Sequence, residues 1–145
     1  MEIVTTWVGG TRIDERLWPI AIVTPSPTGF SQVEFLQFCD RVAQFHERGQ
    51  RFCVVVDLRR TPVISADERR ILAEELERDL EKYPGQLCGI ASVVSDNVQR
   101  GVAIVLTWLV RRPYATAAFP TIEAAVDWAR QKLAEKPPKI AGELS

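Results

Sequence analysis

The stretch RFCVVVDLRRTP, residues 51–62, decides the fold. Six of its first eight residues are apolar and three are consecutive valines, a pattern typical of a strand that is buried on both faces. Charged residues and a proline follow at once, so the strand is expected to end near Asp57, at an edge of the sheet. Loops that leave such an edge carry the binding sites of open α/β folds. In this loop the candidate partner contacts are Arg59, Arg60 and Thr61.

Strand and helix patterns alternate on both sides of this stretch. Residues 2–8 and 17–24 are expected to form two strands, joined by the turn-like link 9–12 into a hairpin. Ser31 with Glu34, and Ser65 with Glu68, have the spacing of a capping box, which predicts a helix start at each serine. Further elements are expected at 87–95 (strand), 97–112 (helix), 114–119 (strand) and from Thr121 to Leu133 (helix).

This order, ββαβαβαβα, predicts a single α/β domain with a mixed, mostly parallel sheet, an N-terminal hairpin and about four helices. The chain has 145 residues, of which 46% are hydrophobic, so one core can be built without disulfides or metals. We assign residues 1–136 to the domain and residues 137–145 to a polar C-terminal tail.

The charge balance and the cysteines limit the classes of partner and the compartment. A net charge of -1 provides no general attraction for nucleic acid. The longest nearly uncharged run, residues 101–110, is shorter than the ~20 residues that span a bilayer. Three widely spaced cysteines without a preceding leader sequence predict reduced thiols. We therefore expect a cytoplasmic protein that does not insert into membranes.

Four segments resemble the SpoIIAA-like proteins of the STAS and CRAL-TRIO-like group. They are VVVDL at 54–58, the helix after Ser65, IASVV at 90–94 and AFPTIEAAVDW at 118–128, and the resemblance extends from about residue 18 to residue 133. It implies a SpoIIAA-like fold and a non-enzymatic, partner-binding regulatory role. In the family, a serine at the start of this helix is phosphorylated. Here that position is Ala66 and the glycine of the motif is absent, so Ser65 or Thr61 would have to serve as a shifted phosphoacceptor.

The loop after Asp57 allows two interpretations at each polar residue. A phosphate on Ser65 would meet free helix N–H groups near Arg59 and Arg60, but Ser65 is also fully explained as the N-cap partner of Glu68, which we favour. The two arginines could bind a carboxylate or phosphate with Asp57 orienting one of them. We favour the simpler interpretation, in which Asp57 caps loop N–H groups and the arginines are solvated.

Catalytic and metal sites are not indicated. His46 is the only histidine, and Cys39 lies two turns away on the same predicted helix, roughly 10 Å along its axis and too far to share a proton. Both are interpreted as flanking an apolar stripe. Cys53 and Cys88 fall in predicted central strands and are interpreted as small core residues. We accordingly expect no enzymatic activity, no cofactor and no metal.

The predicted helix at 97–112 is apolar on more than one face. Ile104, Trp108 and Leu109 would then either be covered by another part of the chain or contact a partner, a second copy of the chain being one candidate. The favoured function is a protein-interaction or regulatory module. The alternative is a binder of a small apolar ligand or lipid beneath this helix, and the third option is a small enzyme of unknown reaction.

Overall fold

The computed structural model describes residues 4–60, 65–95 and 114–135, to which all structural statements refer. Strands and helices alternate after an N-terminal run of strands. In chain order the elements are β1 (Thr5–Val8), β2 (Thr11–Leu17), β3 (Ile20–Thr24), α1 (Gln32–Glu47), β4 (Phe52–Asp57), α2 (Ala66–Lys82), β5 (Leu87–Val93), β6 (Ala115–Phe119) and α4 (Ile122–Ala134). Three predicted features lie outside the described residues: Thr61, the helix at 97–112 and the tail at 137–145.

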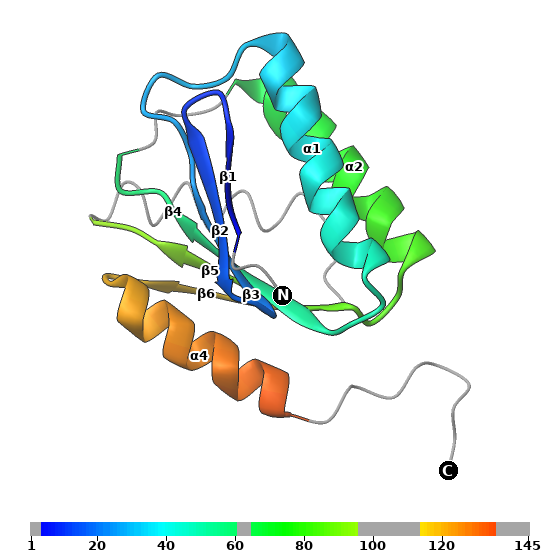
Figure 1. Cartoon of the computed structure of the whole chain (residues 1–145), viewed down its shortest axis with the longest axis vertical. Helices are drawn as coiled ribbons and strands as arrows, with labels where there is room; N and C mark the ends of the chain where they lie inside the picture. The colour runs from blue at the N-terminus through cyan, green and yellow to red at the C-terminus, as the bar shows by residue number, and fades with distance from the viewer. Residues whose placement is uncertain (1–3, 61–64, 96–113, 136–145) are drawn as a thin grey trace.

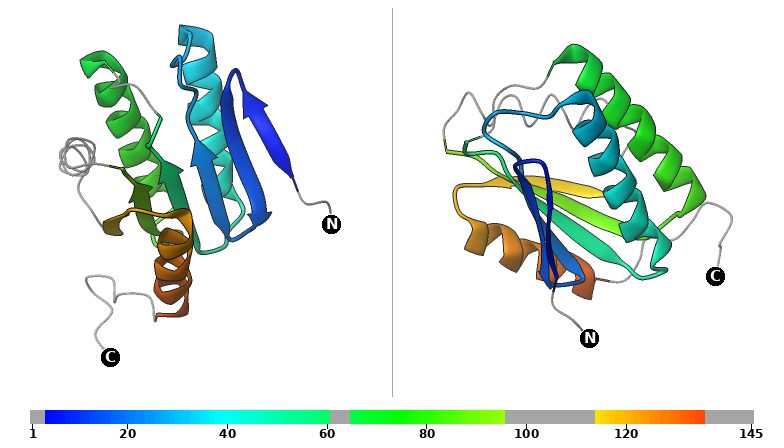
Figure 2. Two further views of the ribbon diagram at one scale, coloured as in Figure 1. Left: turned by 90° about the vertical axis from the view of Figure 1, so that its left-hand side faces the viewer. Right: turned by 45° about the horizontal axis from the view of Figure 1, so that its top comes forward.

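The strands form one six-stranded sheet in the order β1-β2-β3-β4-β5-β6. The pairs β1–β2 and β2–β3 are antiparallel, whereas β3–β4, β4–β5 and β5–β6 are parallel. Helices α1 and α2 cover one face of the sheet and α4 covers the other (Figures 1 and 2). The predicted α/β class and mixed, mostly parallel sheet are confirmed, and the described residues contain three helices.

The predicted N-terminal hairpin is present, since β1 and β2 pair antiparallel, but its second strand was placed wrongly: residues 11–17 form β2, and Ile20–Thr24 form the separate strand β3. Only Gly9 and Gly10 make the first turn, and Gly9 has the positive φ of 58° that such a turn requires. The sequence of β2, TRIDERL, contains four charged residues and therefore resembles a link rather than a strand. Ion pairs make its burial tolerable: Asp14 pairs with Arg12 and Arg16, and Glu15 with Arg41 and Arg48.

Two apolar clusters form the core, one on each face of the sheet. The cluster beneath α1 and α2 includes Ile13, Phe45 and Phe52, each with no exposed surface. The cluster beneath α4 includes Val55 and Ala129, which are equally inaccessible. A fully buried Val, Ile or Phe contributes roughly 1.5–3 kcal/mol, so the alternation of β4 residues between the two clusters ties both layers to the sheet.

The helix starts predicted at Ser31, Ser65 and Thr121 are confirmed. Ser31 and Ser65 are both N-caps with complete capping boxes, and Thr121 caps α4 by accepting from the Ala124 N–H. Among the helices that the structure describes, none has the length and apolar character needed to cross a membrane.

Candidate functional site

The C-terminal ends of β4, β5 and β6 are held together beyond the last strand residues. The Leu58 N–H donates to the Val93 carbonyl, and the Val94 N–H donates to the Phe119 carbonyl, each at 2.9 Å. The strand order follows the chain order throughout, so the described sheet has no point at which the order reverses. In open α/β sheets the ligand crevice forms at such a reversal. The edge after Asp57 therefore lacks the topological reason that first made it a binding-site candidate.

Asp57 binds Arg59 in a bidentate ion pair. The Arg59 Nε and Nη2 atoms donate to the two carboxylate oxygens at 2.9 Å, and the Arg59 backbone N–H donates to Oδ1 at 3.1 Å. These hydrogen bonds lower the pKa of Asp57 below its usual value. Asp57 thus orients Arg59 and caps a loop N–H at the same time, whereas binding of a carboxylate or phosphate by the arginines stays a prediction. Arg60 is exposed.

Ser65 occupies the N-cap of α2, as predicted. Its Oγ accepts from the Glu68 N–H at 3.1 Å, and Glu68 Oε1 accepts from the Ser65 N–H at 3.2 Å. The serine is exposed, and its hydroxyl acts here as an acceptor. Phosphorylation of Ser65 stays a prediction, as does that of Thr61, which is not among the described residues.

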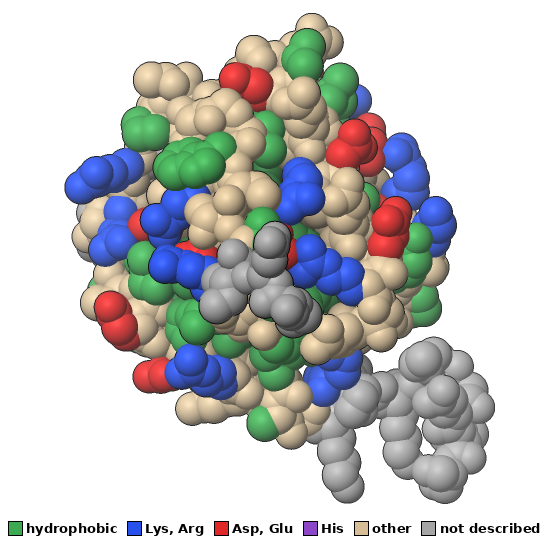
Figure 3. Space-filling model, viewed as in Figure 1, with side chains coloured by type: hydrophobic (Ala, Val, Ile, Leu, Met, Phe, Trp, Pro, Cys, Tyr) green, Lys and Arg blue, Asp and Glu red, His purple; other side chains and the backbone are tan. Residues whose placement is uncertain are grey.

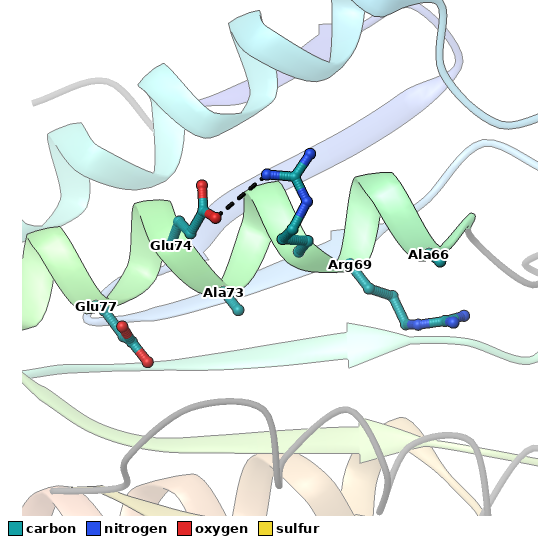
Figure 4. A pocket seen from close by; sticks show the side chains of 6 residues that line it. Ala66, Arg69, Ala73, Glu74 and Glu77 are labelled. Atoms are coloured by element: carbon teal, nitrogen blue, oxygen red, sulfur yellow. Dashed lines mark hydrogen bonds and ion pairs between the residues drawn. The ribbon is translucent and has the colours of Figure 1, made fainter.

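A hollow of about 390 Å³ lies against the first three turns of α2, where it is lined by side chains of that helix (Figure 4). In the close-up, Glu74 lies on one side of the helix while Arg69 and Glu77 extend on the other. Ala66 and Ala73, which are seven residues apart and hence on the same face of the helix, provide the apolar surface. The described residues that line the hollow are Ala66, Arg69, Arg70, Ala73, Glu74 and Glu77.

Charged residues of this hollow, which we call the α2 groove, are paired along the helix. Arg70 contacts Glu74 at 3.3 Å and Asp67 at 3.8 Å. In the sequence such a face resembles an ordinary solvated one, because charge pairs three and four residues apart usually only support a helix. The spacing of Ala66 and Ala73 was the available signal: two small residues interrupt the charges where the helix surface can be approached closely.

His46 and Cys39 pack in the core, as interpreted from the sequence. His46 has no exposed surface and lies edge-on to Phe52 with 4.9 Å between ring centroids. Neither ring nitrogen has a hydrogen-bond partner within the described ranges, and burial lowers the pKa of His46 to about 4. Burial and nearby acids raise the pKa of the Cys39 thiol to about 11. Within the described ranges no three His, Cys, Asp or Glu residues are grouped as metal ligands.

Cys53 has no exposed surface, as expected for a core residue, but Cys88 is only partly buried. Cys88 nevertheless packs against the apolar cluster beneath α4, as a small core residue does. It lies where the register shifts between β4 and β5, which a sequence pattern does not reveal.

Large apolar side chains are exposed on β1 and β2, at one edge of the sheet, and on α1. Trp7 is 63% exposed and Val33 is 65% exposed, with Leu17 and Leu36 less so. On the face shown in Figure 3, hydrophobic side chains are interspersed with basic and acidic ones. Scattered apolar residues of this kind do not define a binding surface.

Ile104, Trp108 and Leu109 lie outside the described residues, so the partner surface or apolar-ligand site predicted there stays a prediction. Comparisons of the chain with family models, with curated proteins and with solved structures found no match. The resemblance to the SpoIIAA-like proteins accordingly also stays a prediction.

Proposed function

We propose that this chain is a non-enzymatic protein-interaction module whose docking surface is the α2 groove, together with the adjoining Ser65 and the Arg59–Arg60 loop. The observation that carries the proposal is the groove itself, in which an apolar strip of two alanines lies among four charged side chains. Small residues permit close approach of another backbone, and charges around them select its orientation.

The charges of the groove are arranged along the helix and define the partner. Arg69 and Arg70 lie in the N-terminal half, and Glu74 and Glu77 lie in the C-terminal half. A complementary segment would present acidic residues to the arginines and basic residues one to two turns further along. Exposed ion pairs contribute only about 0.2–1 kcal/mol each, so these charges serve specificity and association rate more than affinity.

Ser65 is placed where it can regulate this contact. The Arg69 N–H donates to the Ser65 carbonyl at 3.0 Å, so Arg69 lies one helical turn from the serine. A phosphate on Ser65 would add nearly two negative charges beside the basic half of the groove and compete with an acidic partner for it. Phosphorylation is therefore expected to weaken binding.

The proposal is tested by photo-crosslinking in the native cell. A photoreactive amino acid is placed at Glu77, in the groove, or at Gln131, which is exposed on α4. Crosslinking from position 77 should give one discrete protein adduct that position 131 does not give. The identified partner is then purified and titrated against the unmodified chain.

Two arginines provide a matched pair for that titration. The Arg70 and Arg130 side chains are 61% and 60% exposed, and each forms an ion pair within its helix. Arg70→Glu should lower the affinity by about five- to tenfold, and Arg130→Glu should leave it unchanged. Equal effects of the two reversals, or equal crosslinking from both positions, would refute the groove as the docking surface.

A further inference from the structure

Cys53 and Cys88 come together on adjacent strands. Phe52 pairs with Leu87 and Cys53 pairs with Gly89, so Cys88 is the extra residue in the register between β4 and β5. Cys53 belongs to the apolar cluster beneath α4 and Cys88 packs against that cluster, which places both on the same face of the sheet.

The two thiols are near enough to affect one another. Their mutual interaction raises the pKa of Cys53 and lowers that of Cys88. Neighbouring strands lie about 4.8 Å apart, and a disulfide joins Cα atoms separated by roughly 4.4–6.8 Å. Adjacent strands therefore offer a separation that a disulfide can span.

The surroundings of the two sulfur atoms differ. Cys53 has no exposed surface, and its Sγ donates to the Ala129 carbonyl of α4 at 3.7 Å. Cys88 is partly exposed, and its Sγ contacts the Gln86 carbonyl at 3.7 Å. Cys88 is thus the thiol that a small reagent can reach first.

Arg51 supplies a fixed positive charge to Cys88. Its guanidinium Nη1 donates to the carbonyls of Leu133 and Glu135 at 3.1 and 2.9 Å, which holds the side chain against the end of α4. Its Nε is buried and has no hydrogen-bond partner in the part of the chain that the structure describes. The cation favours the Cys88 thiolate. A second cation, the Lys132 ammonium of α4, lies 5.8 Å from the centre of the Trp128 ring.

We propose that Cys53 and Cys88 form a redox site at which a peroxide is reduced and the two thiols become a disulfide. The Cys88 thiolate attacks one peroxide oxygen, the O–O bond breaks, and Cys88 becomes a sulfenic acid as hydroxide leaves. The Cys53 thiol then attacks the Cys88 sulfur, the S–S bond forms, and the sulfenic oxygen leaves as water with the Cys53 proton. The peroxide gains the two electrons that the dithiol loses.

Cys39 is the internal control for this chemistry. It is buried, it lies in α1 on the opposite face of the sheet, and its neighbours are the acids Glu75, Asp40 and Asp79. A carboxylate environment disfavours the thiolate. The proposal requires Cys53 and Cys88 to be oxidised while Cys39 stays reduced, and a general oxidation of accessible cysteines would not produce that difference.

The experiment uses the full chain, reduced, desalted, exposed to hydrogen peroxide and then alkylated. Trypsin releases Cys53 in residues 52–59, Cys88 in residues 83–100 and Cys39 in residues 17–41. Mass spectrometry should find peptides 52–59 and 83–100 joined by a disulfide that reductant reverses, with Cys39 alkylated. Joined peptides involving Cys39, or free thiols at both Cys53 and Cys88 after prolonged treatment, would overturn the proposal.

Variants assign the two roles. Cys53→Ala should accumulate a sulfenic acid at Cys88 that dimedone traps, Cys88→Ser should leave Cys53 unoxidised, and Cys39→Ser should behave as the unmodified chain does. Arg51→Gln should slow oxidation of Cys88 about fivefold at neutral pH. Dimedone labelling of Cys53 in Cys88→Ser at the unmodified rate would contradict the assignment. The peptide map of the unmodified chain decides the proposal even if a variant fails to fold.

Discussion

Gly89 has no side chain, and the indole ring of Trp128 occupies the space that one would fill. A Cβ atom at Gly89 would lie 2.7 Å from Cη2 and 3.0 Å from Cζ3 of Trp128, with the Ala115 carbonyl oxygen 3.3 Å away. The ring also contacts Phe119, with 6.0 Å between ring centroids, so a shift away from Gly89 would disturb a second contact. One missing methyl group thus sets how closely α4 approaches β5.

Gly89→Ala should therefore lower the free energy of unfolding by about 1–3 kcal/mol, the usual effect of overpacking a core. Urea unfolding measures the loss. Because both clashing atoms belong to the six-membered ring of the indole, Trp128→Phe should restore part of the stability when combined with Gly89→Ala. If the two substitutions are simply additive in a double-mutant cycle, the clash is not the cause.

A helix or strand could be predicted from the sequence when the residues that determine it are close together in the chain. The capping boxes at Ser31 and Ser65 are contained in four residues each, and both were confirmed. β2 was missed in part because one of its buried charges, Glu15, is neutralised by residues far along the chain, Arg41 in α1 and Arg48 after it. The sequence TRIDERL itself contains no pattern that predicts those two partners.

The candidate site follows the same division. The Asp57 edge was identified from one strand and its loop, although its topology then removed the reason for a crevice there. The α2 groove was not predicted, because charge pairs along a helix are equally typical of an ordinary solvent-exposed face. The juxtaposition of Cys53 with Cys88 depends on a register shift between two strands, and a register shift is a property of the pair rather than of either segment.

The two helix caps give a prediction at this scale. Ser31→Ala and Ser65→Ala should each lower the free energy of unfolding by about 1 kcal/mol, whereas Ser→Asp at either position should cost little because aspartate is an equally good N-cap. Chemical denaturation followed by circular dichroism measures both. A neutral Ser65→Ala would mean that the serine is retained for a reason other than capping.

Across the whole molecule, two buried groups respond to acid in opposite directions. His46 has a pKa of about 4 when folded, so between its ordinary pKa of 6.5 and about 4 only the unfolded chain takes up this proton, and acid destabilises the fold. Burial raises the pKa of Asp79 to about 6 from 3.8, so over much of the same range only the folded chain binds its proton. Acid therefore stabilises the fold through Asp79, because it removes the cost of keeping a charged carboxylate buried. The two contributions largely cancel.

Removing either group should reveal the other. Asp79→Asn should be more stable than the unmodified chain by about 2 kcal/mol at pH 7, and this advantage should vanish towards pH 4. His46→Phe should show the reverse trend, with an advantage about 3 kcal/mol greater at pH 4 than at pH 7. Urea unfolding at a series of pH values tests both. Parallel pH profiles for the three proteins would show that neither pKa is shifted.

The order of the strands also bears on how the chain folds as it is synthesised. Each strand is added beside the one made just before it, so the sheet can grow from β1 onward while translation continues. Its second apolar face, including Val55 and Ala91, is covered by α4, which is made only when residues 122–134 emerge. Until then that face of the nascent sheet is open to solvent or to a chaperone, and completion of α4 is the step that ends its exposure to aggregation.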